Sequence, residues 1–143
     1  MSSPALANEN KALARRCRED LWKPGNLAIA DQIYDSDALI HNFDPLTPDF
    51  GKGPEAVKQV VRMYQAAFPD AACTIEDLFA EGDKVVARWI GRGTHKGNLG
   101  TTAATGKQVT VTGIDTYRIA GGKVKESWTN WDTLGMLKQL GVS

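Results

Sequence analysis

The stretch "VTVTGIDTYRI" (residues 109–119) is rich in β-branched and aromatic residues, which favour a β-strand. Because side chains alternate across a strand, its odd positions share one face: Val109, Val111, Gly113, Asp115, Tyr117 and Ile119. Asp115 is the one carboxylate on this otherwise mostly apolar face. A buried carboxylate needs either hydrogen-bonding partners or a chemical role, so Asp115 is the leading candidate for a functional residue.

The segments around this strand predict a sheet. Gly121 and Gly122 are typical of a two-residue hairpin turn, and residues 123–131 ("KVKESWTNW") predict the returning strand. With no bulge in this hairpin, Asp115 lies opposite Trp128, and Tyr117 lies opposite Glu126. Alternating apolar residues also predict strands over residues 72–80 and 84–95, joined by a tight turn. We therefore expect four consecutive antiparallel strands.

The N-terminal half has helical spacing instead. Helices are predicted over residues 8–22 and 27–34 and from residue 54 to residue 68, with a short strand over residues 37–43. This order indicates an α+β fold, in which three N-terminal helices cover a curved antiparallel sheet that forms a cone-like half barrel. No repeat or linker is evident, so residues 1–143 are predicted to form one domain. A group of charged residues is interpreted as the solvated face of the first helix: Arg15, Arg16, Arg18, Glu19 and Asp20.

Composition excludes several classes of function. Seventeen basic and seventeen acidic residues leave no electrostatic signature for nucleic acid or anionic membranes. No apolar run approaches the roughly 20 residues of a membrane span, and the N-terminus lacks the apolar core of a signal peptide, so we expect a cytoplasmic protein. Phosphate-loop, GxSxG and HExxH motifs are absent, and Cys17 and Cys73 match no metal or redox spacing. We therefore expect neither a cofactor nor a metal.

A bent sheet capped by helices leaves a cavity in which a small ligand binds. Mostly aromatic walls with few ionisable groups suit a flat or polycyclic hydrophobic molecule. The same aromatic residues are equally typical of a core, and Asp115 could be a structural carboxylate bound to backbone or to Trp128 Nε1. Residues expected to face the cavity are Asp115, His95, Trp89, Trp128, Tyr117, His41, Tyr64 and Phe68.

Three segments carry a family resemblance: "AFPDAACTIEDLFAEGDKVVARWIGRGTHKG", "ATGKQVTVTGIDTYRIAGGKVKESW" and "WDTLGMLKQLG". Over residues 10–141 the chain resembles the SnoaL-like polyketide cyclases of the nuclear transport factor two-like superfamily. The resemblance implies a cone-shaped α+β fold, often dimeric. It also implies ring closure of a polyketide ester by intramolecular aldol condensation, without cofactor or metal. The acid/base aspartate of those enzymes maps to Asp115, and His95 would polarise the ketone or balance the proton of Asp115.

Three other functions stay open. The superfamily also contains isomerases, hydroxylases and epoxide hydrolases, as well as binding proteins without activity. Ser127 stands where the family usually has a histidine, which favours a non-catalytic binding protein for a hydrophobic molecule. A scaffold that dimerises through the exposed face of the sheet is a third interpretation. The Gly- and Thr-rich residues 96–106 are expected to form a mobile loop that could act as a lid.

Overall fold

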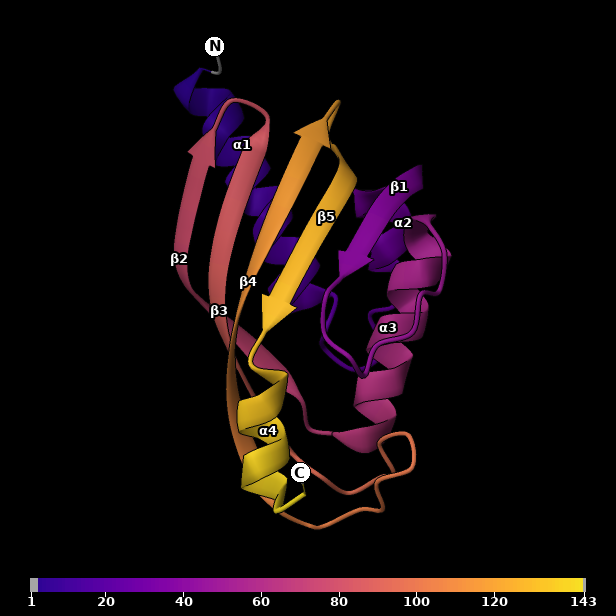
Figure 1. Ribbon diagram of the computed structural model, residues 1–143. Coiled ribbons are helices and arrows are strands. Elements are labelled where there is room, and N and C mark those ends of the chain that lie inside the picture. The colour runs from indigo at the N-terminus through magenta and orange to yellow at the C-terminus, as the bar shows by residue number, and fades with distance from the viewer. Residues whose placement is uncertain (1–2, 143) are drawn as a thin grey trace.

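The computed structural model of the protein describes residues 3–142 (Figure 1). The α+β class is confirmed, and the predicted order of helices and strands is observed. Helix α1 continues into a single π-helical turn, η1, which was not predicted. The elements are α1 (Pro4–Arg15), η1 (Arg16–Asp20), α2 (Ile29–Ile33), β1 (Tyr34–Asn42), α3 (Gly53–Ala67), β2 (Ala72–Glu81), β3 (Lys84–Thr94), β4 (Gln108–Ala120), β5 (Lys123–Trp131) and α4 (Thr133–Leu140).

The five strands form one curved, unclosed sheet in the order β1-β5-β4-β3-β2. Strands β2 to β5 pair antiparallel with their sequence neighbours, as predicted. Strand β1 departs from the expected antiparallel sheet, because it lies at the edge parallel to β5. Such a parallel pair requires a long connection, and α3 together with β2 to β4 supplies it.

The predicted register of the last hairpin is right near the turn and wrong beyond it. Ala120 pairs with Lys123 as expected for a two-residue turn, but a β-bulge follows between Arg118 and Ile119. One extra residue, Lys125, is accommodated there, so every later pair shifts by one position. A shift of one residue moves side chains to the opposite face of the strand. Asp115 therefore lies opposite Thr129 instead of Trp128.

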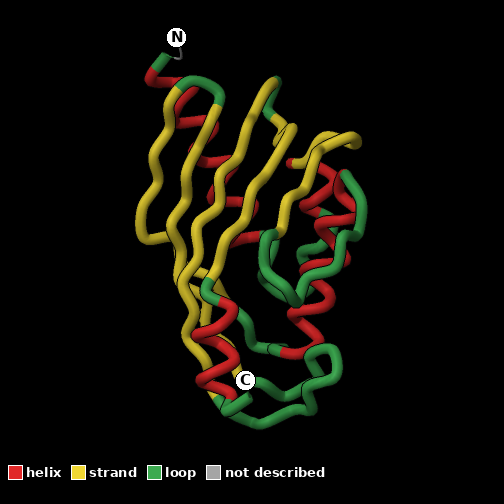
Figure 2. The backbone as a smooth tube through the Cα atoms, in the orientation of Figure 1, coloured by secondary structure: helices red, strands yellow, loops and turns green. Residues whose placement is uncertain are grey.

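The helices cover one face of the sheet and bury two apolar clusters. In Figure 1, α1 crosses behind the upper parts of β2 to β4, while α3 lies beside β1. The first cluster packs η1, α2 and α3 against β3, β4 and β5, with Leu21, Ile33 and Val85 almost fully buried. The second lies nearer α4, where Met136 and Leu140 pack with the end of α3. The loop that follows β1 runs beside the upper and middle part of α3, and the loop that follows β3 lies at the lower end of this helix (Figure 2).

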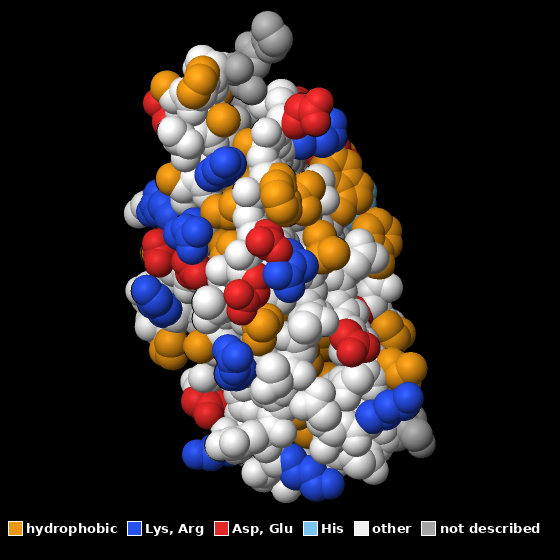
Figure 3. Space-filling model, turned by 90° about the vertical axis from the view of Figure 1, so that its left-hand side faces the viewer, with side chains coloured by type: hydrophobic (Ala, Val, Ile, Leu, Met, Phe, Trp, Pro, Cys, Tyr) orange, Lys and Arg blue, Asp and Glu red, His pale blue; other side chains and the backbone are white. Residues whose placement is uncertain are grey.

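The surface carries no strong single-sign patch on the side that β2 forms. There, hydrophobic side chains are interspersed with Lys, Arg, Asp and Glu (Figure 3). Across residues 3–142, we find no helix with the length and apolar character that crossing a membrane requires.

Candidate active site

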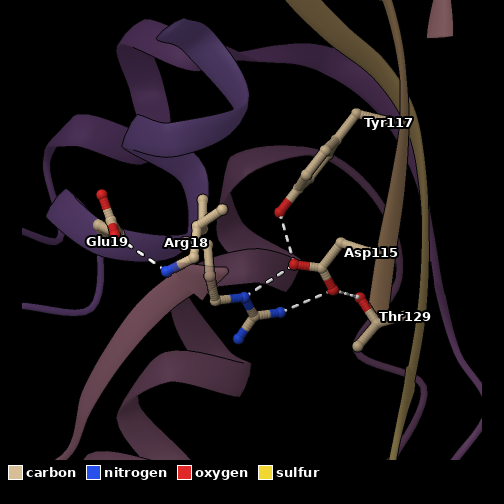
Figure 4. A network of polar contacts seen from close by, with 6 residues as sticks. Arg18, Glu19, Asp115, Tyr117 and Thr129 are labelled. Carbon is tan, nitrogen blue, oxygen red and sulfur yellow. Dashed lines mark hydrogen bonds and ion pairs between the residues drawn. The ribbon is translucent and has the colours of Figure 1, made fainter. Parts of the chain in front are cut away.

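Asp115 is fully buried and accepts four hydrogen bonds (Figure 4). Arg18 binds it with two nitrogens, Nε to Oδ2 at 2.7 Å and Nη2 to Oδ1 at 2.8 Å. The Tyr117 hydroxyl donates to Oδ2 at 2.7 Å, and the Thr129 hydroxyl donates to Oδ1 at 2.9 Å. Each carboxylate oxygen therefore accepts two bonds, and the charge of Asp115 is compensated inside the protein.

The fold brings these four residues together from three elements. Tyr117 follows Asp115 by two positions on β4 and so shares its face, and Thr129 is its cross-strand neighbour on β5. Arg18 reaches the sheet from η1. A π-helical turn widens the helix locally and is frequent at functional sites.

The expectation that the charged residues of the first helix face solvent is wrong for Arg18 and Glu19. Arg18 is 8% exposed, and Glu19 accepts a hydrogen bond from the backbone N–H of Ile75 at 3.0 Å. The sequence does contain a signal that Arg18 is buried. It lies four residues after Ala14 and three before Leu21, which is the spacing of one apolar helix face. A buried basic residue on that face requires an acidic partner elsewhere, and Asp115 is that partner.

Burial and the neighbouring Asp115 carboxylate determine the protonation states of Arg18 and Tyr117. Burial acts to lower the pKa of Arg18, but the Asp115 carboxylate opposes this, and the pKa ends well above its usual value. Burial, followed by the charge of Asp115, raises the pKa of Tyr117 well above its usual value. Arg18 is therefore a cation and Tyr117 a neutral hydrogen-bond donor near neutral pH.

An apolar cavity of about 100 Å³ lies beside this network. Arg18 and Thr129 line it, whereas Asp115 does not. A smaller cavity of about 40 Å³, lined by Arg18, Tyr117 and Thr129 among others, adjoins it. A ligand in the larger cavity thus meets the partners of Asp115 first. The other lining residues are Trp22, Asn42, Thr47, Val60, Tyr64, Phe68, Ala71, Cys73, Trp89, Gly91, Arg92, Gly93, Val109, Val111, Trp131 and Met136.

Three of the predicted aromatic residues line this cavity: Tyr64, Phe68 and Trp89. The Tyr64 hydroxyl also lies 2.7 Å from Thr47 Oγ1, which fixes the ring against the loop after β1. Trp22 and Trp131 complete the aromatic wall and were not predicted. Trp131 shares the face of Thr129, so the shifted register explains its position.

Trp128 and His41 lie outside this cavity, which corrects the expectation for both. The bulge turns Trp128 to the other face of the sheet, where its ring stacks on His41 at 5.6 Å between centroids. His41 Nε2 lies 2.7 Å from Glu126 Oε2, and this hydrogen bond is the main cause of the lowered pKa of Glu126. His41 lines a separate cavity of about 210 Å³ under the loop after β1.

His95 is fully buried, but the structure does not bring it to Asp115. It follows β3 eight residues after Ala87, the cross-strand neighbour of Asp115, which is about 26 Å along an extended strand. Its Nδ1 accepts a hydrogen bond from the Thr105 backbone N–H at 3.2 Å, and its ring packs on Phe68. None of the three cavities described here includes His95 in its wall.

The loop after His95 is anchored at several points. The backbone N–H groups of Lys96 and Gly97 both donate to the carbonyl of Ala67 at the end of α3. The carbonyl of Lys107 accepts from the His95 backbone N–H at 2.9 Å, so the two ends of the loop are joined. Leu99 is buried in the second apolar cluster. We propose that His95 organises this loop.

Asp70 gives this region a pH dependence. It accepts hydrogen bonds from the backbone N–H and hydroxyl of Thr94, both at 2.7 Å, and these two bonds, the backbone one first, lower its pKa below 3.8. A lowered pKa means that the carboxylate stabilises the fold above about pH 4, and that this stabilisation is lost as the pH falls through the folded-state value. The wild type is expected to melt at a higher temperature than Asp70→Asn at neutral pH, and the difference is expected to shrink as the pH falls below about 4. Thermal melts across this range test it, and a difference that does not change with pH would contradict it.

Gly113 shapes the cavity wall because it leaves room for the Trp89 indole. A Cβ added at Gly113 would overlap Trp89 Cζ2 and Cε2. Gly113→Ala is therefore expected to displace this ring and to destabilise the fold by about 1–3 kcal/mol. Thr112→Ala, on the exposed side of the same strand, is the control. Urea unfolding of both variants tests this, and equal free energies of unfolding would show that the ring moves freely.

The cysteines and acidic groups do not suggest further chemistry. Both cysteines are free; burial raises the pKa of Cys17 to about 12 and also raises that of Cys73, so neither is a ready thiolate. No three His, Cys, Asp or Glu side chains in residues 3–142 are grouped as a metal site would require.

The aromatic cavity and the buried ion pair beside it form a candidate small-molecule site on the α+β fold. The sequence pattern of the SnoaL-like polyketide cyclase family matches residues 12–140, and the chain belongs to this family.

Individual relatives agree with this assignment. The chain is 35% identical to the aklanonic acid methyl ester cyclase DnrD of Streptomyces peucetius over 105 residues, which are 73% of this chain and 68% of DnrD. It is 33% identical over 114 residues to the aklanonic acid methyl ester cyclase DauD of Streptomyces sp. strain C5, covering 79% of this chain and 67% of DauD. The structure of TsrD from Streptomyces laurentii has the same fold, with a TM-score of 0.79 at 24% identity over the whole of both chains.

Proposed function

We propose that the protein closes a ring in a polyketide ester by an intramolecular aldol reaction that requires no cofactor. Family membership supports a cyclase, and the two curated relatives are named as cyclases of a polyketide methyl ester. The observation that carries the proposal is the buried pair of Asp115 and Arg18 beside an apolar, aromatic cavity.

The proposed reaction is balanced without a co-reactant. A proton leaves the carbon between two carbonyls, and its electron pair forms an enolate. The enolate carbon attacks a ketone of the same molecule, so one carbon–carbon bond forms and the ketone oxygen becomes an alkoxide. The alkoxide takes back the proton, and the product is an isomer of the substrate.

Asp115 is the proposed acid/base group, and Thr129 connects it to the cavity. The Thr129 hydroxyl donates to Asp115 Oδ1 at 2.9 Å and lines the cavity. It can pass its own proton to Asp115 while it accepts one from the substrate side. Such a positioned acid/base group contributes about 100- to 10,000-fold, and the aromatic walls add to the rate by holding the substrate folded with its reacting carbons close.

A polyketide methyl ester with a 1,3-dicarbonyl unit tests this proposal. After incubation with the wild type, liquid chromatography with mass detection is expected to show a new compound of unchanged mass. Its 13C spectrum should show one ketone carbon replaced by a carbinol carbon. Recovery of unchanged ester from a protein that binds it would contradict the proposal.

A non-catalytic binding protein is the second candidate, and one observation favours it. Arg18, Tyr117 and Thr129 occupy all four acceptor positions of the Asp115 carboxylate, as expected for a structural carboxylate. In that case the ester would bind in the aromatic cavity and leave unchanged. The turnover experiment above therefore separates the two candidates.

We further propose that the protein forms a homodimer through the face of the sheet opposite the cavity. Phe79 and Ile114 on that face are 63% and 47% exposed, and the stacked rings of His41 and Trp128 lie on it as well. Sedimentation equilibrium is expected to give twice the mass of one chain for the wild type and a lower mass for Ile114→Lys. A wild-type mass of one chain would exclude the dimer.

A further inference from the structure

Arg18 is held more firmly than a salt bridge alone requires. Two of its three guanidinium nitrogens bind Asp115, and its Cζ lies 4.1 Å from the centre of the Trp89 ring and 5.3 Å from that of Trp22. Cation–π contacts of this kind strengthen when they are desolvated, and the Arg18 side chain is only 10% exposed. The guanidinium plane is therefore fixed in position and orientation.

The third nitrogen, Nη1, points away from Asp115 (Figure 4). Within residues 3–142 no oxygen or nitrogen acceptor is hydrogen-bonded to Nη1, whereas Nε and Nη2 are both paired, and the Cys73 thiol is a further polar neighbour of the guanidinium. Arg18 lines the aromatic cavity and the smaller cavity next to it, and Asp115 lines neither. Arg92 also lines the larger cavity but is exposed, so the buried charged group that a ligand in the cavity meets is Arg18.

We propose that Arg18 is a catalytic residue that binds the enolate oxygen of the substrate through Nη1, and that Asp115 orients it. This inference rests on the proposed ring closure and extends it. During deprotonation, negative charge develops on a carbonyl oxygen, and a cation already fixed beside that oxygen stabilises the transition state more than the neutral substrate. A planar, delocalised guanidinium also stacks well on an aromatic wall, which an ammonium does not.

The opposite charges of Arg18 and Asp115 should have opposite effects on the binding of an enolate. Asp115 compensates the charge of Arg18, so the ion pair has no net charge. The site therefore stays neutral overall when a neutral 1,3-dicarbonyl compound binds. Removal of the Asp115 charge would leave Arg18 as an uncompensated cation, and an enolate would then bind more tightly. The two variants Arg18→Gln and Asp115→Asn are therefore expected to change enolate binding in opposite directions.

The test uses 1-phenylbutane-1,3-dione, a diketone whose enolate is distinguished from the neutral form by ultraviolet absorbance. Absorbance titrations against pH and protein concentration give the dissociation constant of the enolate and the pH at which the bound diketone ionises. Arg18→Gln is expected to weaken enolate binding about tenfold or more and to raise that pH. Asp115→Asn is expected to tighten binding and to lower it. Arg15→Gln removes a matched arginine from the exposed ion pair with Glu19 and should change neither value.

A folding control and a second Arg18 variant keep the test valid if Arg18→Gln folds poorly. Thermal melts report folding, and Arg18→Lys, which keeps the charge but loses the planar geometry, should bind the enolate with intermediate strength. Unchanged enolate binding in both Arg18 variants, or weaker binding in Asp115→Asn, would overturn the role of Arg18.

The inference and the proposed function fail in different ways. Ring closure by the wild type, together with unchanged diketone binding in the Arg18 variants, would leave the cyclase proposal standing and refute the role of Arg18. Opposite shifts in the two variants, with no ester cyclised, would support the Arg18 site and refute the cyclase.

Discussion

Replacement of Arg18 by Met is expected to lower the free energy of unfolding by about 3–5 kcal/mol. The reason is that Asp115, which is fully buried, would lose its cationic partner and keep only the hydroxyls of Tyr117 and Thr129 as hydrogen-bond donors. A buried carboxylate that loses its counter-charge carries a desolvation penalty that two hydroxyl groups do not repay. Urea unfolding near neutral pH, analysed by linear extrapolation, measures the loss.

The exposed pair between Arg15 and Glu19 provides the matched control. Arg15→Met removes an arginine whose side chain is 50% exposed, and surface pairs of this kind contribute about 0–1 kcal/mol. The double variant Arg18→Met/Asp115→Leu removes both buried charges and should recover most of the lost stability. An Arg18→Met variant that loses no more stability than Arg15→Met would show that the buried pair does not support the fold.

Asp115→Asn is expected to lower kcat for ring closure by about 100- to 10,000-fold. Asn has nearly the same shape and can still accept from Arg18 and Thr129, but its amide cannot take up the substrate proton. Affinity for the neutral ester should change little, because Asp115 does not line the cavity. Steady-state kinetics combined with equilibrium binding of the ester separates the two effects.

Asp31→Asn is the control for this variant, because it removes an exposed carboxylate that is paired with Lys58 and lies away from the sheet face proposed for the dimer. Its kcat should equal that of the wild type. If Asp115→Asn retained wild-type kcat, the acid/base role of Asp115 would be excluded and the structural interpretation of its hydrogen bonds would stand.

The local pattern around Asp115 was sufficient to find the centre of the candidate site. Strand alternation placed Asp115 and Tyr117 on the buried face, and both are indeed buried there in direct contact. The α+β order followed from the change of period from helical to alternating near residue 70. Both predictions depend on interactions between near neighbours along the chain.

The partners of Asp115 were not predictable in the same way, because tertiary packing decides them. Arg18 is separated from Asp115 by 97 positions, and its cluster of charged neighbours resembles a solvated helix face. Thr129 and Trp131 enter the site only because one extra residue at Lys125 shifts the register of β5. Nothing in the composition of the hairpin indicates that bulge, so Trp128 was placed on the wrong face.

A single-turnover experiment tests the proposed chemistry, with wild-type protein in excess over a 1,3-dicarbonyl polyketide methyl ester. Excess protein keeps the ester bound, so that the observed rate reports the chemical step separately from binding and product release. We expect the bound ester to convert to the ring-closed isomer in one exponential phase that is at least about 100-fold slower in Asp115→Asn. An ester that stays bound and unchanged in the wild type, or that closes equally fast in both proteins, would contradict the proposed role of this site.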